Sequence, residues 1–552
     1  MKAHFTRSSN DPPASEHTMS KENIIVAAQP EAAEAGAKVL MQGGNAVDAA
    51  MTTALVQGVV DPQMTGIAGF GNCQLYLPAK GVHTCIDFHG KTPLAATAEM
   101  WEDRLESETR DGFGFVLKDN VNDIGYQAIT TPGSLMAYGQ AIEQYGTLDW
   151  KDVCQPAIEF AKKGFAIRSK MYAWWNDGAA YGRVPVTDRL RFTESGRQLY
   201  FHESGALKHF GDHFINPDLA QTLTRIADHG WRTFYEGDIA EEIAADMAAH
   251  GGLLSREDLA TYHTTVTDPL RGNYRGFDIT TNHPPGGGVM LLEMLNILEH
   301  FDLAALGHNT TDYIRFVCEA MRAATADKEA HVGDPAFFDV PLERLISKPH
   351  AADIAARIKR GERMNVERYT PESKDTTHVA VKDAQGNCVT MTHSLGMPSG
   401  VITPGLGFMY NGCMGVFDPR PGRAGSIAPG KSRFSSLCPT MVFEGGEPLI
   451  ILGAPGGTQI AMGVLQVLLN MLDFKMPVVE AVSAPRFSAT SNAIDITNRI
   501  PSYVVEPLAN DGYEVIRLPD TFGIAAVHAI EQTPAGPRGG ADPGDDGVAL
   551  IV

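Results

Sequence analysis

Hydrophobic and polar residues alternate along two short runs of the chain, 377–382 and 388–394, in the way that is typical of neighbouring β-strands. The first run places Val379 and Val381 on one face, and the second is rich in β-branched residues, which favour strands. The polar sequence Asp-Ala-Gln-Gly-Asn at 383–387 separates the runs and predicts a tight turn. The pattern therefore predicts a β-hairpin.

The length of the loop determines which residues of this hairpin face each other. If residues 384–386 form a three-residue loop, with the glycine in the left-handed conformation, residue 383 faces residue 387. Counting back along both strands then places Thr376 opposite Ser394. Two hydroxyl groups are therefore expected to lie face to face at the open end of the hairpin.

A polar stretch, 371–375, precedes this pair and is expected to be exposed. A cut of the chain between Asp375 and Thr376 would leave a threonine at a new N-terminus. Such a residue combines a nucleophile with a base, because its own α-amino group, with an unperturbed pKa of about 8, can accept the proton of its hydroxyl. The alternative is that Thr376 begins an ordinary strand.

Other segments predict layers of strands and helices. Short apolar runs predict strands at 23–28, 72–77, 82–88, 274–281, 440–443, 449–452, 513–518 and 525–531. Apolar residues at three- and four-residue steps predict helices at 31–41, 46–60, 135–145, 150–163, 217–229, 239–250, 289–300, 310–330, 459–472 and 503–509. The charged segment 357–374 predicts a mobile linker that ends at the proposed cut. This order indicates a layered α/β fold.

Two loops carry further candidate chemistry. Residues 453–459 join an apolar strand to an apolar helix, so the amides of Gly456 and Gly457 would begin the helix and stabilise developing negative charge as an oxyanion hole. The alternative is a plain turn between strand and helix. Ser435 and Ser436 place two hydroxyls in a loop before a strand, where they would bind a polar ligand group or cap backbone amides.

Residues 425–432 match the phosphate-binding pattern GxxxxGKS, but their context argues against a nucleotide site. A phosphate loop follows a buried strand and opens a helix, whose amides then point at the phosphates. Here the preceding residues, 417–422, are rich in proline and glycine, and Pro439 follows soon after the motif. We therefore expect no nucleotide hydrolysis.

Composition narrows the classes of function. The 552 residues include 45 Lys and Arg against 66 Asp and Glu, a formal charge of −21, and no basic run that would follow a nucleic-acid backbone. With no apolar leader and no run of roughly eighteen apolar residues, a cytoplasmic protein without a membrane partner is expected. The seven cysteines are scattered, as expected for reduced thiols, and no metal-ligand spacing is found.

Together these residues resemble the γ-glutamyltransferase (γ-glutamyl transpeptidase, glutathione hydrolase) family of N-terminal nucleophile hydrolases, whose small subunit begins with Thr-Thr-His and a D-x-x-G-N hairpin. The matching segments are 43–50, 132–134, 333–335, 376–378, 383–387, 435–436, 455–457 and 484–487. The resemblance implies a four-layer αββα sandwich, made as one precursor that is cut by its own threonine. The products would be a large subunit (23–375), preceded by an extended or disordered lead (1–22), and a small subunit (376–552).

The resemblance also implies roles for individual residues. Thr376 would be nucleophile and base, Ser394 would position it, and the amides at 456–457 would bind the oxyanion. The serines at 435–436 would contact the substrate. No metal and no organic cofactor is implied, and the partners would be a small-molecule amide substrate and water, or less readily an amine, as acyl acceptor.

The chain departs from the family at the head-group pocket. The family has an arginine after an Asp-Phe pair that binds the α-carboxylate of glutamate, and here His89 stands in its place. The polar residues that hold the amino-acid head group are replaced by Gly396, Cys413 and Val416, and the lid loop is shortened to about 419–428. His89 and Cys413 are therefore expected in the substrate pocket of a self-processing amidohydrolase whose substrate is not a standard γ-glutamyl compound.

Two alternatives stay open. The first is a γ-glutamyl hydrolase or transferase with a rebuilt pocket, in which Arg420 or Arg423 supplies the missing cation. The second is an uncut relative that binds without catalysis. The pairing of Thr376 with Ser394 and the intact glycines at 456–457 argue against the second alternative.

Overall fold

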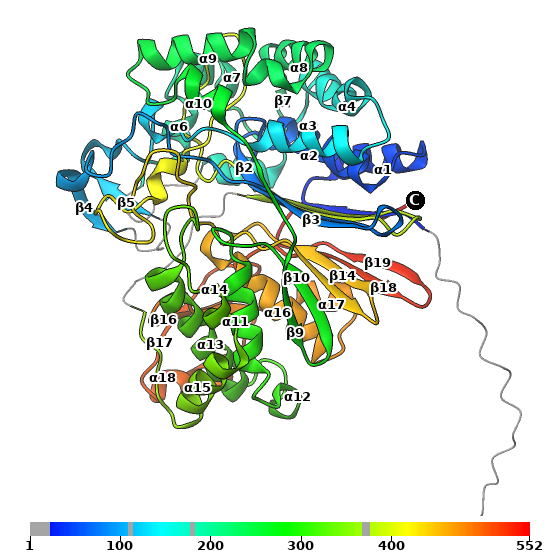
Figure 1. Ribbon diagram of the computed structural model, residues 1–552, viewed down its shortest axis with the longest axis vertical. Helices are drawn as coiled ribbons and strands as arrows, with labels where there is room; N and C mark the ends of the chain where they lie inside the picture. Colours follow the sequence, from blue (N-terminus) through cyan, green and yellow to red (C-terminus); the bar gives the residue numbers. More distant parts are fainter. Residues whose placement is uncertain (1–21, 109–113, 177–182, 367–375) are drawn as a thin grey trace, which may run out of the picture.

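Two antiparallel β-sheets lie face to face at the centre of the molecule, and helices cover the outer face of each sheet (Figure 1). This computed structural model describes residues 22–108, 114–176, 183–366 and 376–552. Asp375 of the predicted cut and residues 1–21 of the predicted lead lie outside the described residues. The predicted mixed α/β fold is confirmed, with layers in the order helix, sheet, sheet, helix (Figure 1).

The first sheet contains the predicted hairpin near its middle. Its strands, in spatial order, are β20 (Val548–Ile551), β1 (Ile24–Ala27), β11 (Thr377–Lys382), β12 (Cys388–Ser394), β2 (Phe70–Leu77), β3 (Val82–Phe88) and β8 (Thr265–Thr267). β11 pairs with β1 near one end of the chain, and β12 pairs with β2. The hairpin is therefore held on both sides by strands that lie more than three hundred residues earlier in the sequence.

The second sheet supplies the strand that leads to the predicted oxyanion turn. Its strands, in spatial order, are β19 (Gly536–Gly540), β18 (His528–Thr533), β14 (Glu447–Gly453), β13 (Thr440–Glu444), β10 (Phe277–Thr281) and β9 (Leu270–Tyr274). β14 has a neighbouring strand on each side, β18 and β13. The turn that follows β14 therefore begins where an interior strand of the sheet ends.

The alternation along β11 explains how the hairpin serves two cores. Val379 and Val381 face the helices and belong to the large core cluster on that side. Ala380 faces the second sheet and packs in the layer between the sheets with Met441 and Ile451. Because successive side chains of a strand point to opposite faces, both faces of the hairpin are buried.

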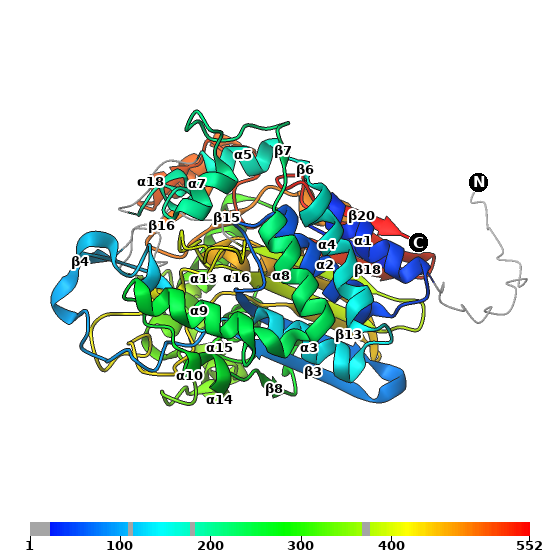
Figure 2. The same cartoon turned by 90° about the horizontal axis from the view of Figure 1, so that it is seen from above.

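Helices form the two outer layers. Over the first sheet lie α1 (Pro30–Met41), α2 (Ala46–Val60), α3 (Ser134–Tyr145), α4 (Trp150–Lys163) and α8 (Pro217–His229), with α4 and α8 side by side (Figure 2). Over the second sheet lie α11 (Gly288–Leu298), α13 (Thr311–His331), α15 (Lys348–Lys359), α16 (Ile460–Leu472) and α17 (Val478–Ser483).

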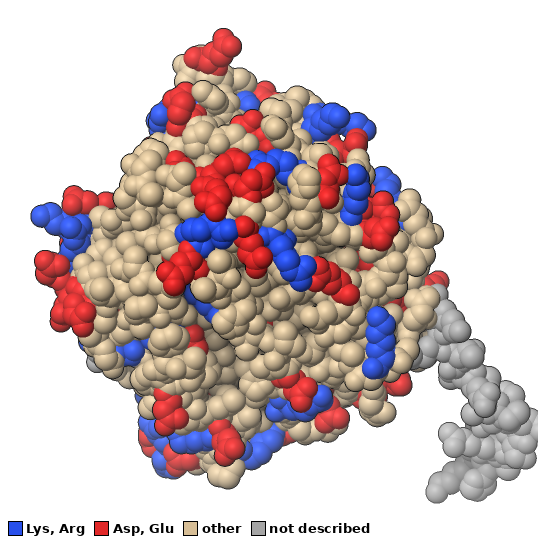
Figure 3. Space-filling view, turned by 45° about the horizontal axis from the view of Figure 1, so that its top comes forward, with Lys and Arg blue, Asp and Glu red and all other residues tan. Residues whose placement is uncertain are grey.

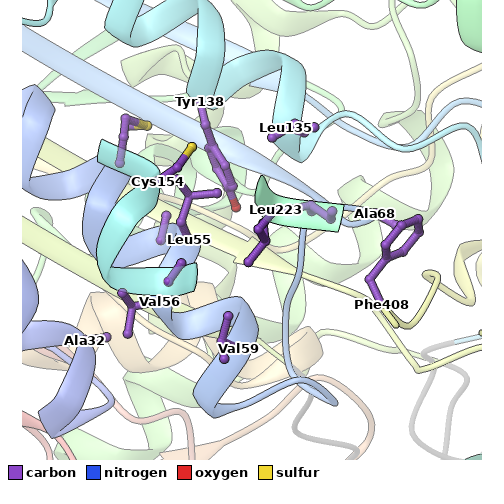
Figure 4. Packing of buried hydrophobic residues seen from close by; sticks show 14 of the residues in the cluster. Ala32, Leu55, Val56, Val59, Ala68, Leu135, Tyr138, Cys154, Leu223 and Phe408 are labelled. Carbon is purple, nitrogen blue, oxygen red and sulfur yellow. The ribbon is translucent and has the colours of Figure 1, made fainter. Parts of the chain in front are cut away.

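Helix α2 is buried on nearly all sides, because it is covered by other helices as well as by the sheet. Figure 4 shows Leu55 and Val59 of α2 in the same cluster as Tyr138 of α3 and Leu223 of α8. A side chain of about leucine size contributes roughly 1.5–3 kcal/mol when it is fully buried, so this central helix is a large part of the core.

Smaller elements surround the layers. The helices are α5 (Ser169–Trp175), α6 (Val186–Leu190), α7 (Glu194–Tyr200), α9 (Asp238–Ala249), α10 (Arg256–Thr261), α12 (Leu303–Leu306), α14 (Leu342–Leu345) and α18 (Ser502–Asn510). The strands are β4 (Leu105–Glu108), β5 (Phe115–Leu117), β6 (Phe165–Ala166), β7 (His213–Phe214), β15 (Phe487–Ser488), β16 (Ala493–Ile496) and β17 (Glu514–Arg517).

The structure corrects the bounds of two predicted segments. The strand predicted at 274–281 is confirmed from residue 277 as β10, but Arg275 and Gly276 form the turn of the hairpin β9–β10, with positive φ angles of 49° and 88°. The linker predicted from residue 357 begins later, because α15 continues to Lys359 and buries Ile358 among the helices of the second sheet. The part of that linker at 367–374 lies outside the described residues.

Charged side chains of both signs are mixed over the molecular face in Figure 3. Ion pairs of the described residues include Arg232 with Glu143 and Arg225 with Glu242. All seven cysteines are free and buried. Within the described residues, no helix is both long and apolar enough to span a membrane.

Candidate active site

The hairpin has the predicted register. Its pairs run from Lys382 opposite Cys388 to Thr377 opposite His393, so the next pair outward is Thr376 and Ser394. The loop is also as predicted, since the glycine at 386 has a φ of 84° and its amide donates to the carbonyl of residue 383. The Oγ1 of Thr376 donates a hydrogen bond of 3.3 Å to the Oγ of Ser394.

Both hydroxyls are held in a buried position facing the second sheet. Thr376 lies two residues before His378 and four before Ala380, so strand alternation places its side chain on their face, toward β14. Thr376 is 6% exposed and Ser394 is fully buried. The Oγ of Ser394 also accepts a hydrogen bond of 2.7 Å from the amide of Gly396, which fixes its position.

The imidazole of His393 lies on the helix side of the hairpin. Its Nε2 donates to the Oε1 of Gln57 at 2.8 Å, and its Nδ1 accepts from the hydroxyls of Thr65 at 2.9 Å and Tyr138 at 2.6 Å. Burial lowers the pKa of His393 to about 3, so this imidazole is neutral near neutral pH.

The imidazole of His378 lies on the same face as Thr376. Its Nδ1 is 2.8 Å from the Oγ1 of Thr392, and the ring stacks on His528 with centroids 6.4 Å apart. Burial, with the neighbouring histidines, holds the pKa of His378 well below its usual value. Among the described residues, no hydrogen bond joins Thr376 to this ring or to that of His393.

The predicted oxyanion turn follows β14 directly. A Cβ placed on Gly453, the last residue of β14, would lie 2.3 Å from the ring of His378, so the turn begins against the hairpin. Gly456 and Gly457 have φ angles of 142° and 54°, which favour glycine. Neither of their amides donates a backbone hydrogen bond within the described part of the chain.

The helical element that begins at this turn differs from the prediction. Gly457 opens a short 3₁₀ helix, η7 (Gly457–Gln459), and α16 begins only at Ile460. The two amides therefore belong to a 3₁₀ turn and not to the first turn of α16. The reason is the backbone at Gly456, whose positive φ is incompatible with an α-helix that starts there.

A cavity of about 530 Å³ lies next to these elements. Ser435 and Ser436 line it, as does Thr458, which follows the oxyanion turn. Among the described residues, the remaining wall comes from residues 108 and 114–115, from 365–366, and from parts of 326–333 and 416–434. The predicted substrate serines and the predicted oxyanion turn therefore border one volume.

His89 is buried behind Ser435. Its Nδ1 donates to the Oδ2 of Asp87 at 2.8 Å, and its Nε2 lies 2.5 Å from the Oγ of Ser435. With the proton on Nδ1 donated to Asp87, Nε2 is the ring nitrogen that can accept from the serine hydroxyl. His89 thus orients Ser435, and it is not part of the cavity wall among the described residues.

Cys413 is also buried, at the start of the 3₁₀ helix η6 (Cys413–Val416). Burial raises the pKa of its thiol, and the neighbouring Arg433 opposes that rise. Val416, at the end of η6, lines the cavity. The thiol of Cys413 accepts a hydrogen bond from Arg433, which lines the cavity.

Arg433 is a wall residue that the sequence analysis missed. It is 2% exposed, and its Nη1 donates to the Sγ of Cys413 at 3.5 Å. The guanidinium lies 4.6 Å from the centre of the Phe70 ring, and its Nε donates to the carbonyl of Phe434. Its position two residues before Ser435 could have indicated a place in the cavity wall.

Arg420 and Arg423, which the sequence offered as substitutes for the missing family arginine, are both engaged in ion pairs. Arg420 pairs with Asp418 at 2.7 Å and with Glu108 at 2.6 Å. Arg423 lies 3.4 Å from the same Asp418. Both side chains border the cavity, but their charges stabilise the loop that carries them.

The lysine of the GxxxxGKS match has a structural role. The Nζ of Lys431 donates to the carbonyls of Ala424 and Ser426, each at 2.8 Å. The segment has neither a strand directly before it nor a helix directly after it. The motif therefore closes its own loop by hydrogen bonds, in agreement with the rejection of a nucleotide site.

One group of side chains in the described residues has the composition of a metal site. Glu293, Asp327 and His350 lie on α11, α13 and α15, with His350 Nε2 at 2.7 Å from Asp327 and 3.5 Å from Glu293. Burial raises the pKa of Glu293 to about 8, and hydrogen bonds to the carboxyl groups raise the pKa of His350. His350 thus contacts the carboxyl groups of one buried and one partly buried residue.

Comparisons with known proteins find similarity along most of the chain. The family model described as Gamma-glutamyltranspeptidase matches residues 32–552. The chain is 37% identical to the acylase ACY 1 proenzyme of Pseudomonas sp. (strain V22) over 526 residues, 94% of this chain and 91% of the relative. It is 32% identical to the glutathione hydrolase proenzyme of Escherichia coli (strain K12) over 487 residues, 85% of this chain and 81% of the relative.

A solved structure extends this similarity to the fold. The crystal structure of cephalosporin acylase from Bacillus halodurans matches with a TM-score of 0.85 and 26% sequence identity, over 99% of both chains. The similarity therefore includes both sheets and both helix layers.

Proposed function

Because the chain belongs to the γ-glutamyltranspeptidase family, as its sequence predicted, we propose that it is an amidohydrolase whose nucleophile is Thr376. The observation that carries this proposal is the contact between the hydroxyls of Thr376 and Ser394 at the end of a buried hairpin. The four layers of helices and sheets support its assignment to the N-terminal nucleophile hydrolases.

The first step is a cut of the precursor between Asp375 and Thr376. It produces a large subunit (23–375) with its lead and a small subunit (376–552). Named relatives that are proenzymes support this step. Since β11 of the small subunit pairs with β1 of the large one, the two subunits remain one body after the cut.

In the proposed acylation, the Oγ1 of Thr376 attacks the carbonyl carbon of the amide, and its own α-amino group accepts the proton. The amides of Gly456 and Gly457 stabilise the oxyanion, because they have no backbone acceptor in the described structure. The α-ammonium group then protonates the leaving amine. Water attacks the resulting ester in the second half of the reaction and restores the threonine.

The proposed substrate is an amide other than a standard γ-glutamyl compound. The positions where the family holds the amino-acid head group carry Gly396, Cys413 and Val416, and none of these side chains is charged at neutral pH. The acylases among the relatives support this choice. Similarity to a glutathione hydrolase keeps a γ-glutamyl hydrolase as the second candidate function.

A denaturing gel together with an amidase assay tests the proposal. The purified wild-type protein should give two bands, and Thr376→Ala should give a single chain of 59.5 kDa without activity. Thr376→Ser, which keeps a hydroxyl, serves as the matched control and should retain part of both reactions. An intact wild-type chain that still hydrolyses amides would exclude Thr376 as the nucleophile, and an intact inactive chain would favour the non-catalytic alternative.

A further inference from the structure

Three ionisable side chains meet in the helical layer over the second sheet, outside the candidate active site. They are Glu293 of α11, Asp327 of α13 and His350 of α15, and one ligand atom from each lies within 4.8 Å of the other two. The three helices pack against one another in the lower part of Figure 1. The cluster therefore joins helices that are well separated along the chain.

The carboxyl group of Glu293 lies in an apolar environment. Glu293 is 1% exposed and belongs to a helix, α11, that carries no other charged side chain. Burial of a carboxyl group is costly unless its oxygens have partners. The Oε1 of Glu293 makes no hydrogen bond within the described residues, although it points into the cluster. A buried acceptor in this state favours a bound cation.

His350 does not satisfy both carboxyl groups through one nitrogen. Its Nε2 lies 2.7 Å from the Oδ2 of Asp327 and 3.5 Å from the Oε1 of Glu293. One N–H group donates well to one acceptor, and the shorter contact selects Asp327. The longer contact is an ion-pair distance without hydrogen-bond geometry. A metal ion bound to Nε2 would contact both carboxylates, because it forms several bonds from one centre.

The spacing of the three ligand atoms fits one ion. Bonds from a zinc ion to imidazole nitrogen and carboxylate oxygen are about 2.1 Å long, so ligand atoms around a tetrahedral ion lie about 3.4 Å apart. The contacts of 2.7 and 3.5 Å, with 4.8 Å as the upper limit, bracket this separation. Two carboxylates and a neutral imidazole also balance the charge of a divalent ion, which lowers the cost of burying it.

Neighbouring contacts hold the ligands toward a common point. The hydroxyl of Ser347, the N-cap of α15, accepts from the amide of His350. Asn296 lies one turn after Glu293 on α11, and its Nδ2 donates to the carbonyl of Ile346 at 2.7 Å. This bond ties α11 to the start of α15. Contacts of this kind orient metal ligands and raise the affinity of a site.

The second oxygen of Asp327 has weaker contacts of its own. Its Oδ1 lies 3.8 Å from the Nη2 of Arg344 and 3.9 Å from the Nε2 of His331. Both distances are longer than the 2.7 Å between Oδ2 and His350. Asp327 therefore keeps Oδ2 directed at the cluster.

The set of donors favours a transition metal over magnesium or calcium. Imidazole nitrogen suits Zn²⁺, whereas Mg²⁺ and Ca²⁺ prefer oxygen ligands alone. The side chains of Asp327 and His350 are 19% and 18% exposed, so an ion and a water ligand can enter from their side. Three protein ligands and one water would complete a tetrahedral site.

The cluster lies beside the wall of the catalytic cavity. Asp327 stands between Ala326 and Lys328, and both of these residues line the cavity. The ligand residues themselves do not line it within the described part of the chain. An ion at the cluster would therefore hold the end of α13, which forms part of the wall, without touching the substrate.

We propose that Glu293, Asp327 and His350 bind one divalent transition-metal ion, preferentially Zn²⁺, which clamps α11, α13 and α15 together beside the cavity. The ion stabilises the fold and takes no part in the proposed reaction. The inference stands apart from the proposed function, since it depends only on these side chains and their helices.

Binding of Zn²⁺ to the full chain without a histidine tag tests the proposal. Calorimetry on metal-free protein should show a single high-affinity equivalent of Zn²⁺, for which excess Mg²⁺ does not compete. His350→Gln and Glu293→Gln should each lose about 100-fold or more in affinity, because loss of an outer contact alone already costs about 10–100-fold. Asp353→Asn, at an exposed carboxylate of α15, is the matched control and should bind like the wild type.

Thermal unfolding tests the clamp. Zn²⁺ at about 100 times its dissociation constant should raise the Tm of the wild type by roughly 2 °C, since the ion binds the folded state. His350→Gln should show no such shift. Equal affinity in the wild type and in both ligand variants would overturn the proposal. Weak binding of many ions to all of them would also overturn it, because exposed acidic groups would then account for the binding.

A measurement on the wild type alone covers the case in which the variants do not fold. Diethylpyrocarbonate modifies accessible imidazoles, and a bound ion occupies the Nε2 of His350. Zn²⁺ at about ten times its dissociation constant should slow the modification of His350 roughly tenfold, as measured by peptide mass spectrometry. The exposed His300 is the control and should react at an unchanged rate. A rate at His350 that does not respond to Zn²⁺ would exclude the site.

Discussion

The two halves of the candidate site, the strand side with its pair of hydroxyls and the loop side on the cavity wall, are built in different ways. Thr376 and Ser394 belong to a hairpin inside a sheet, where hydrogen bonds to neighbouring strands determine their positions. Arg433, Ser435 and Ser436 belong to a stretch without helix or strand. The strand side is set by regular strand pairing within a sheet, whereas the loop side depends on individual contacts with distant parts of the chain.

Those distant contacts can be followed along the loop side. The amide of Ser432 donates to the Oδ2 of Asp334 at 2.8 Å, and the amide of Ser435 donates to the carbonyl of Pro285 at 2.9 Å. The amide of Arg433 donates to the carbonyl of Gly90 at 3.4 Å. The reacting hydroxyls and the substrate contacts should therefore respond to different substitutions. Substitutions on the strand side should affect both self-cutting and turnover, whereas substitutions on the loop side should affect turnover alone.

The largest effect is expected on the strand side. Thr376→Ala removes the hydroxyl needed for both reactions, so the chain should stay uncut and amide hydrolysis should fall by more than about 1,000-fold. A gel and an anilide assay measure the two effects on one preparation. If a cut chain appeared in this variant, another residue would have to be the nucleophile of self-processing.

A smaller effect is expected on the loop side from Lys431→Met. The buried ammonium donates to two carbonyls of its loop, and its loss should raise KM and lower kcat/KM by about tenfold while the chain is still cut. The loss of these hydrogen bonds should also lower the free energy of unfolding by about 1–3 kcal/mol. Lys38→Met, at an exposed lysine of α1, is the control. Failure of self-cutting in Lys431→Met would break the separation of the two sides.

Ser394→Ala should have a moderate effect on both reactions. It removes the acceptor that orients the Oγ1 of Thr376, and one such hydrogen bond contributes about 0.5–1.5 kcal/mol, or roughly threefold to tenfold in rate. The rate of cutting and the kcat should therefore fall together. A decrease in only one of the two rates would show that Ser394 serves only that step.

The last prediction concerns stability in acid, which bears least directly on the two reactions. Burial lowers the pKa of His393 to about 3 in the folded chain, whereas the unfolded chain binds this proton at its usual pKa near 6.5. Between these values the unfolded state binds more protons, so stability is fully present above the unfolded pKa and decreases as the pH falls. One such group adds at most about 1.4 kcal/mol per pH unit.

Urea unfolding of wild type and His393→Gln between pH 7 and pH 4 measures this contribution. The variant should show a shallower decrease in the free energy of unfolding, since glutamine does not titrate. Equal slopes would mean that burial does not keep the imidazole of His393 neutral in the folded chain.

Parts of the fold and the site could be predicted because they depend on neighbouring residues. The hairpin loop has a glycine where a positive φ is needed, and the strand alternation then leads to Thr376 and Ser394. The turn between β9 and β10 escaped prediction, because Arg275 adopts a positive φ that its residue type does not announce. The length of α15 escaped it because burial of Ile358 outweighs the charges around it.

By itself the sequence determined the layered fold, the register that brings two hydroxyls together and the glycines of the turn after β14. Local hydrogen bonds, strand alternation and backbone sterics act over a few residues, so their outcome is visible in the order of residues. Only the tertiary structure decided how the arginines of the cavity wall are held: Arg420 and Arg423 are in ion pairs with Asp418, and the guanidinium of Arg433 lies against the ring of Phe70. Contacts between residues hundreds of positions apart determine such choices, because packing and ion pairing depend on proximity in space rather than along the chain.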